Sequence, residues 1–169
     1  MVFTILPLEG IQWDDQNIPL GSTKKDIEAK LGQPDIVRNS YYYFNSELRF
    51  DFSENNELEF IEFLSGCNGN IQPIIYGVKA FQVSADHLYN VLESNNSGDL
   101  VDCENGYSFA FPNIGIGIYR ESTPNDVTDL INEMQETGMD TKENPNVAEE
   151  QLKASHWATI SVAAADYSW

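Results

Sequence analysis

The side chains best suited to acid–base or nucleophilic chemistry are few and scattered in this chain. The two histidines, His87 and His156, have no cysteine near them and form no His-x-x-x-His or Glu-x-x-His pair. We expect such histidines to be structural or solvated rather than general bases or metal ligands. The two cysteines, Cys67 and Cys103, lack the spacing of a zinc site or a disulfide framework. They are expected to be free thiols in a reducing cytosol.

Paired carboxylates are the next candidates for catalysis. The pairs are Asp14-Asp15, Glu57 with Glu59, and Glu149-Glu150. Nothing marks two of these carboxylates as lying in contrasting environments, which a glycosidase-type acid and base require. The acidic run over 51–62 lacks the ligand spacing and central glycine of a calcium loop. We therefore predict no catalytic residue, no metal ligand and no cofactor, and a protein that is not an enzyme.

A Gly-x-Gly motif occurs at Gly115 and Gly117. It lacks the third glycine and the following helix of a phosphate-binding loop, so it does not predict a nucleotide site. Its neighbours alternate as in a strand, where glycine marks a bulge or a close approach by another backbone. A guest strand is therefore expected to be able to approach the chain at these two glycines.

The charge of the chain is its most informative property. The sequence has 27 Asp and Glu against nine Lys and Arg, a net charge of −18 over 169 residues. With 41% hydrophobic and 12% aromatic residues, the chain can form a core and is not a disordered acidic tail. A charge of this size repels nucleic-acid phosphates and anionic lipid, and it accelerates the encounter with a basic protein. The composition predicts a protein that binds a basic macromolecule, but neither nucleic acid nor membrane.

The residues at the start of the chain bear on the cellular location of the protein. Residues 1–9 contain no basic region and no long apolar run, so they do not resemble a signal peptide. No apolar stretch approaches the roughly 18 residues that a membrane helix needs. We expect a cytoplasmic protein.

Three segments show the pattern of an amphipathic helix. They begin at Thr23, Ser84 and Thr123, hydroxyl residues that can cap a helix N-terminus. Each then places apolar residues at helical spacing. The predicted helices are 23–31, 84–92 and 123–134, with a polar loop at 137–146 and a short helix at 147–153.

The sequence also predicts two β-hairpins. The first spans 41–64 and turns at Asn55-Asn56, and the second spans 107–119 and turns at Pro112-Asn113. Counting outward from the first turn makes Arg49 and Glu62 direct cross-strand neighbours, and it places Leu58 on their side of the sheet. Shorter strands are expected at 10–13, 77–83 and 157–162.

The order of these elements predicts an α+β fold in which helices pack on antiparallel sheets. We expect a single domain, 1–169. A helix followed by a hairpin occurs twice, which predicts an internal duplication with halves at about 10–66 and 74–137.

The mixed face of the first hairpin is the predicted partner-binding site. Alternation is expected to bury Tyr42 and to direct Tyr41 and Tyr43 to the other side, beside Glu47 and Asp51. That side is either a second packed face under a helix or an exposed patch of tyrosine and acid. Tyrosines among carboxylates suit a basic protein surface. The predicted partner-binding residues are Tyr41, Tyr43, Glu47, Asp51, Glu57, Glu59 and Glu62, with Gly115 and Gly117 as the second choice.

Two stretches carry a resemblance that extends over most of the chain. They are LGSTKKDIEAKLGQPD at 20–35 and IQPIIYGVKAF at 71–81. The chain resembles the CdiI immunity proteins of bacterial contact-dependent growth inhibition systems. The resemblance implies a Whirly-like fold and a partner, the C-terminal toxin domain of a cognate CdiA effector, which is a metal-dependent nuclease. It also implies that a toxin β-hairpin joins a sheet edge of the immunity protein, a mode called β-augmentation.

Three other functions compete with this interpretation. An acidic DNA mimic would inhibit many nucleic-acid-binding enzymes rather than one toxin. A small hydrolase would require a pair of catalytic acids that the sequence does not reveal. A lipoprotein-like assembly factor is the third, because such proteins also contain segments like 20–35, but the missing signal peptide argues against it.

Overall fold

The computed structural model describes residues 1–169 as four helices, one short 3₁₀ helix and 13 strands. In chain order they are β1 (Val2–Leu6), β2 (Gly10–Trp13), β3 (Gln16–Pro19), α1 (Lys24–Leu31), β4 (Asp35–Val37), β5 (Ser40–Tyr43), β6 (Leu48–Phe52), β7 (Leu58–Phe63), β8 (Gln72–Ile75), β9 (Val78–Lys79), α2 (Ala85–Asn96), β10 (Val101–Asp102), β11 (Ser108–Phe111), η1 (Pro112–Ile114), β12 (Ile116–Tyr119), α3 (Pro124–Glu136), α4 (Pro145–Ser155) and β13 (Thr159–Ala163).

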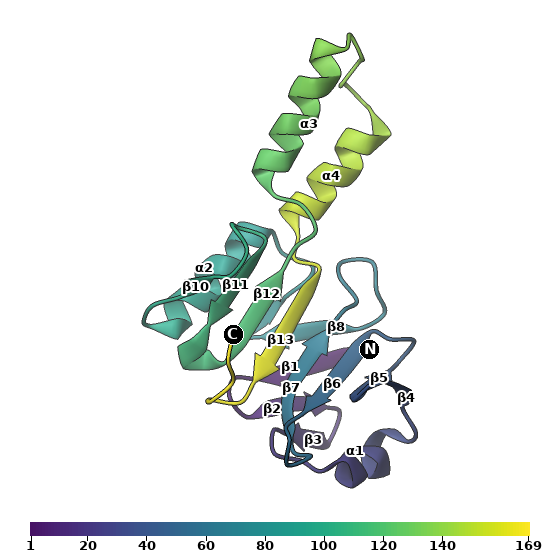
Figure 1. Cartoon of the computed structure of the whole chain (residues 1–169), viewed down its shortest axis with the longest axis vertical. Coiled ribbons are helices and arrows are strands. Elements are labelled where there is room, and N and C mark those ends of the chain that lie inside the picture. Colours follow the sequence, from purple (N-terminus) through teal and green to yellow (C-terminus); the bar gives the residue numbers. More distant parts are fainter.

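The strands form two sheets (Figure 1). The small sheet has the order β3-β2-β1-β8-β9, and the large sheet has the order β10-β11-β12-β13-β7-β6-β5-β4. Every pair of neighbouring strands is antiparallel except β1 and β8, which run parallel. Strand β13 lies between β7 and β12 and joins the two hairpin regions into one sheet. The predicted α+β class is confirmed.

A single core lies between the two sheets and beneath helices α1 and α2. Phe3 of β1 meets Phe63 of β7 edge to face, with ring centroids 5.6 Å apart. Tyr89 of α2 contacts Phe111 of β11, and Ile27 of α1 is fully buried in the same cluster. One face of the large sheet is therefore covered by the small sheet and two helices. The opposite face, called here the outer face, is covered only in part.

The predicted helices are confirmed together with their caps. Thr23 and Thr123 accept hydrogen bonds from the backbone of the third helical residue, and Ser84 does the same for α2. Helix α2 runs four residues beyond its predicted end, to Asn96, a buried polar residue whose Oδ1 accepts from the Asn113 N–H at 2.9 Å. The apolar periodicity therefore ends before the helix does. None of the helices is long and apolar enough to cross a membrane.

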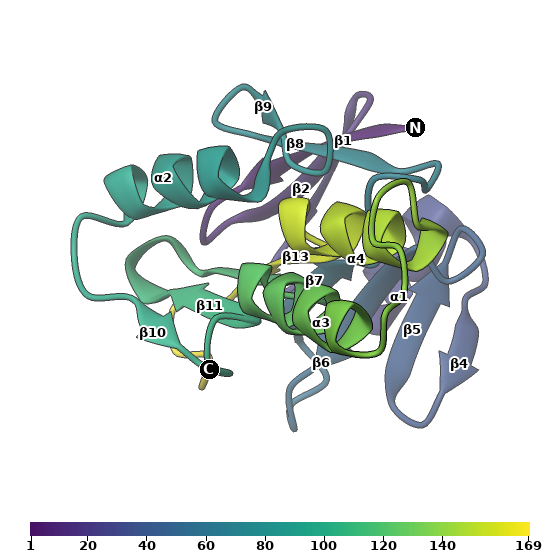
Figure 2. The same ribbon diagram turned by 90° about the horizontal axis from the view of Figure 1, so that it is seen from above.

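Helices α3 and α4 form an antiparallel hairpin that projects from one end of the large sheet (Figure 1). The view from above shows the two helices side by side (Figure 2). Only Met134 of α3 and Val147 and Ala154 of α4 are buried. This hairpin does not cover a sheet face, so most of its surface is open to a partner.

The predicted hairpins are confirmed, and Arg49 of β6 lies directly opposite Glu62 of β7. Leu58 is misplaced in the prediction, because a β-bulge at Asp51 and Phe52 pairs Phe52 with Leu58 and turns Leu58 into the core, where it is 1% exposed.

The strand predicted at 77–83 is wrong in extent. Strand β9 covers only Val78 and Lys79, and the main strand of this region is β8, which precedes it. In the two predicted halves the structure has the series β2-β3-α1-β4 and β8-β9-α2-β10. The internal duplication itself stays a prediction.

Candidate partner-binding site

Tyr41 and Tyr43 lie on the core face of the large sheet, so their predicted exposure is wrong. They are 7% and 5% exposed, whereas Tyr42 lies opposite Arg49 on the outer face. The cause is a turn at 44–47, where three successive residues adopt positive φ and the chain reverses between β5 and β6. Alternation cannot be counted through such a turn.

The hydroxyl groups of these two tyrosines bind α1 and its end rather than a partner. The Tyr41 hydroxyl donates to Glu28 Oε1 at 2.9 Å, and the Tyr43 hydroxyl donates to the Gly32 carbonyl at 3.2 Å. Burial, together with the nearby Glu28 carboxylate, raises the pKa of Tyr43 to about 12. Both side chains therefore fix α1 against the sheet, so the alternative of a face packed under a helix is confirmed for these two tyrosines.

Glu47 lies in the turn between β5 and β6 and anchors a neighbouring loop. Its carboxylate accepts hydrogen bonds from the Ile71 backbone N–H at 2.8 Å and from Asn70 Nδ2 at 2.9 Å. Partial burial opposes ionisation, but the hydrogen bonds from Asn70 and Ile71 outweigh it and lower the pKa of Glu47. These contacts give Glu47 a structural role.

Glu57 and Glu59 flank the start of β7. Glu57 is exposed in the turn of the first hairpin, where its backbone pairs with Ser53 and forms a bridge with Thr23. The carbonyl of Glu59 accepts a hydrogen bond from the Ala164 N–H at 2.9 Å, which ties the last residues of the chain to β7.

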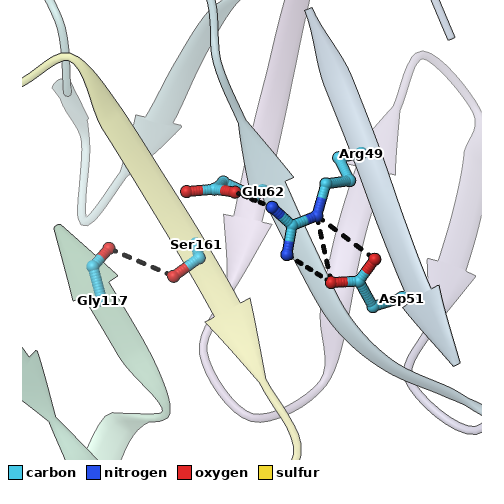
Figure 3. Close-up of polar contacts among 5 residues, drawn as sticks. All are labelled: Arg49, Asp51, Glu62, Gly117 and Ser161. Carbon is cyan, nitrogen blue, oxygen red and sulfur yellow. Dashed lines mark hydrogen bonds and ion pairs between the residues drawn. The ribbon is translucent and has the colours of Figure 1, made fainter. Parts of the chain in front are cut away.

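Asp51 and Glu62 share one arginine on the outer face (Figure 3). Arg49 Nη1 lies 3.1 Å from Glu62 Oε2, while its Nε lies 3.0 Å from Asp51 Oδ2 and its Nη2 makes a second contact with that carboxylate. Burial raises the pKa of Glu62, although the charge of Arg49 acts in the opposite direction. The two carboxylates are therefore largely compensated within the chain.

Gly117 lies in the interior of the large sheet, because β12 is bonded on both sides, to β11 and β13. No strand edge is free there, so the prediction that a guest strand approaches at Gly115 and Gly117 is wrong. The Ser161 hydroxyl donates to the Gly117 carbonyl at 3.4 Å (Figure 3). A Cβ at residue 117 would lie 2.4 Å from Trp169 Cζ3, so the glycine makes room for an indole ring.

Gly115 is required by the turn between β11 and β12. Its φ of 62° closes the 3₁₀ turn between β11 and β12, and a Cβ there would lie 2.6 Å from the Ala163 carbonyl oxygen. This glycine serves the turn.

A groove of about 590 Å³ opens on the outer face, and we call it the outer groove. Its floor is formed by β7, β13, β12 and β11, one wall by residues 167–169, and the other wall by β10 and the turn after it. Tyr167 stacks on Phe60 at 5.0 Å and holds the first wall in place. The polar and aromatic lining includes Glu62, Asp102, Glu104, Tyr119, Ser161 and Trp169.

The outer groove brings together two of the predicted residues, Glu62 and Gly117, and Asp51 lies beside it through Arg49. The other predicted residues do not line it: Tyr41, Tyr43, Glu47, Glu57, Glu59 and Gly115. The prediction missed Asp102, Glu104 and Tyr119. A signal for the two acids was present, because residues 85–150 hold 14 of the 27 acidic residues and only two of the nine basic ones.

The wall at β10 is also a free edge of the large sheet. Strand β10 pairs with β11 alone, and the Cys103 N–H donates to the Ser108 carbonyl at 2.9 Å. Since bonded and non-bonded pairs alternate along an antiparallel ladder, Asp102 is the residue whose N–H and C=O face away from β11. A further strand can therefore be added at Asp102.

No group of three or more His, Cys, Asp and Glu side chains is arranged to hold a metal ion, and both cysteines are free. No family model matches the chain, and no curated protein or solved structure matches it either.

Proposed function

We propose that this protein is an immunity protein that binds and neutralises the basic C-terminal toxin domain of a cognate CdiA effector. The observation that carries the proposal is the coincidence of two features at one edge of the large sheet: the free edge of β10, and the outer groove beside it, whose lining includes the carboxylates of Glu62, Asp102 and Glu104. The resemblance of the sequence to CdiI proteins supplies the class of partner.

The free edge supplies affinity. A toxin strand that aligns antiparallel to β10 gains main-chain hydrogen bonds to the N–H and C=O of Asp102. The Asp102 side chain holds the following turn, since it accepts from the backbone N–H groups of Glu104 at 3.2 Å and Gly106 at 2.9 Å. The edge is therefore fixed before the partner arrives.

The outer groove supplies specificity for basic side chains. The ion pairs of the chain involve only Arg49 and Lys153 as cations, so Asp102 and Glu104 have no cation of their own. Tyr119, which is 37% exposed, and Trp169 add aromatic rings to the same groove. Carboxylates beside aromatic faces suit arginine and lysine side chains of a partner.

Co-expression tests the proposal directly. The chain is produced with the CdiA C-terminal domain encoded immediately upstream of its gene, and complex formation and cell survival are measured. We expect a stable complex and rescued cells. If there is neither complex nor rescue, the immunity function is wrong.

Two charge-reversal variants test whether the partner binds at the outer groove. Glu104→Lys is expected to weaken binding at least tenfold, whereas Glu54→Lys, at a position that is also exposed but lies in the turn of the first hairpin, stays within about twofold at the same salt concentration. If both variants bind as the unaltered protein does, the partner docks elsewhere.

The projecting α3–α4 hairpin favours a second candidate, an acidic DNA mimic. Residues 124–155 hold eight acidic residues and two lysines on an element that stands clear of the sheets (Figure 1). Competition with DNA for several unrelated basic proteins would support this function. Tight binding to one toxin alone would exclude it.

A further inference from the structure

The large sheet has a second free edge, at β4, whose surface differs from that of β10. Strand β4 pairs only with β5, and none of the hydrogen bonds outside helices and sheets involves residues 35–37. Ile36 and Val37 are 60% and 57% exposed. Edge strands are usually protected by charged or bulged residues, so two adjacent exposed aliphatic residues on such an edge point to a covering partner.

The register of β4 identifies which backbone groups are free. A two-residue turn at 38–39 joins β4 to β5, and Val37 lies opposite Ser40. The pair that closes a two-residue hairpin is a hydrogen-bonded pair, so the next pair, Ile36 with Tyr41, is not. The N–H and C=O of Ile36 therefore point away from β5, toward the open edge.

The charge around β4 decides what kind of partner fits. Residues 24–38 hold four basic and three acidic residues, whereas the remainder of the chain holds five basic and 24 acidic ones. A basic protein finds no excess of acid at this corner. A second copy of the chain, which is repelled by most of the surface, meets the least repulsion here.

We propose that β4 is a self-association edge through which two copies of this chain pair antiparallel about a twofold axis at Ile36. Two identical strands that pair antiparallel form an isologous contact, in which the N–H of Ile36 in each copy donates to the C=O of Ile36 in the other. The two Ile36 side chains then lie next to each other, and the large sheets of the two copies become continuous. Because β4 and β10 are opposite ends of the sheet, the dimer leaves the outer groove free in both copies.

Sedimentation equilibrium of the full chain over a wide concentration range tests this proposal. The mass is expected to rise from 19.1 kDa toward twice that value. Self-association should strengthen by at least threefold between about 0.05 and 0.5 M NaCl, because salt screens the repulsion between two copies of charge −18. Toxin binding depends on salt in the opposite direction, so the two associations are distinguishable.

Two substitutions at one position locate the contact. Ile36→Pro removes the N–H that faces the open edge and replaces the isoleucine side chain by a smaller apolar ring, and proline is tolerated on an edge strand at such a position. Ile36→Lys removes the apolar contact and places like charges opposite each other. Each variant is expected to weaken dimerisation at least tenfold. Met139→Lys is the matched control, because Met139 is 58% exposed but lies in the loop of the projecting hairpin, and it should leave dimerisation unchanged.

Circular dichroism verifies that each variant is folded, and Ile36→Lys remains informative if the proline variant is not. A protein that stays monomeric at high concentration and high salt would overturn the proposal. So would a dimer that tolerates Ile36→Lys, because it must then use another surface.

Discussion

Arg49 is the residue on which the polar centre of the outer face depends. Its guanidinium joins Asp51 and Glu62 (Figure 3). It also lies 5.3 Å from the centre of the Phe60 ring. The side chains of Asp51 and Glu62 are only 23% and 16% exposed, so water compensates them poorly when the arginine is absent. The floor of the outer groove therefore depends on this one cation.

Arg49→Met is expected to lower the free energy of unfolding by about 1–2 kcal/mol at neutral pH, a value reduced for the partial exposure of the group. Burial already raises the pKa of Glu62 in the folded protein, and loss of Arg49 raises it further. A carboxyl group whose pKa is higher in the folded than in the unfolded protein destabilises the fold at pH values above both pKa values. This destabilisation is relieved as the pH falls through the pKa of the folded protein.

Urea unfolding at neutral and mildly acidic pH measures this effect. The deficit of Arg49→Met should shrink at the lower pH, and the additional change Glu62→Gln should restore part of the stability. An equal deficit at both pH values, with no recovery in the double variant, would show that lost packing of the arginine is the cause.

Glu47→Gln gives the opposite pH dependence. The hydrogen bonds from Asn70 and Ile71 lower the pKa of Glu47 below its usual 4.5. The Glu47 carboxylate therefore stabilises the fold fully at pH values above its usual pKa. This stabilisation is lost as the pH falls through its lower pKa in the folded protein. The variant should be less stable by about 1 kcal/mol at neutral pH and approach the unaltered protein in acid.

Chemical unfolding as a function of pH checks this prediction. Glu54→Gln, an exposed carboxylate without a hydrogen-bond partner, is the matched control and should show little change. A constant difference between Glu47→Gln and the unaltered protein at every pH would contradict the assigned role of the carboxylate.

At the scale of elements, the α3–α4 hairpin differs from every other part of the fold. Its two helices pack chiefly against each other, and little of either one is buried. Elements with few buried apolar contacts open locally at lower free energy than the core does. The hairpin is therefore the part of this protein most free to adjust to a partner.

Native-state hydrogen exchange should find residues 124–155 less protected than β7, β12 and β13. Thr123→Ala removes the side chain that caps α3 and accepts from the Asp126 N–H at 3.3 Å. Loss of such a cap, worth about 1 kcal/mol, should accelerate exchange in α3 about fivefold while the sheet is unaffected. Equal acceleration in the sheet would mean that the hairpin opens only with the whole domain.

At the scale of the whole molecule, charge is distributed unevenly. Of the 14 acidic residues over 85–150, eight lie in 124–150, on the projecting hairpin, and two, Asp102 and Glu104, lie at the β10 edge, whereas the nearly neutral segment 24–38 includes the β4 edge. The net charge of −18 also repels itself within the folded chain.

Added salt should therefore stabilise the protein. The thermal midpoint is expected to rise by a few degrees between about 0.02 and 0.3 M NaCl, because screening weakens the repulsion among the carboxylates. Calorimetry at low protein concentration separates this effect from dimerisation, and an Ile36→Lys variant should show the same rise. A midpoint that falls with salt would mean that the ion pairs of Arg49 and Lys153 outweigh the repulsion.

The amino-acid sequence by itself determined the local structure of this protein. The caps at Thr23, Ser84 and Thr123, the turn at Asn55-Asn56 and the pairing of Arg49 with Glu62 were all predictable. These features depend on hydrogen bonds and side-chain periodicity within a few residues or across one turn, so the sequence carries them directly.

The tertiary structure alone decided which surfaces are available. Tyr41 and Tyr43 lie in the core because the turn at 44–47 interrupts the alternation on which their predicted side was based. Gly117 lies inside the sheet rather than at an edge because β13 pairs with β12. The free edges at β4 and β10 depend on which of 13 strands end a sheet. Strand order follows from contacts between residues far apart in the chain, and no periodicity within a segment encodes it.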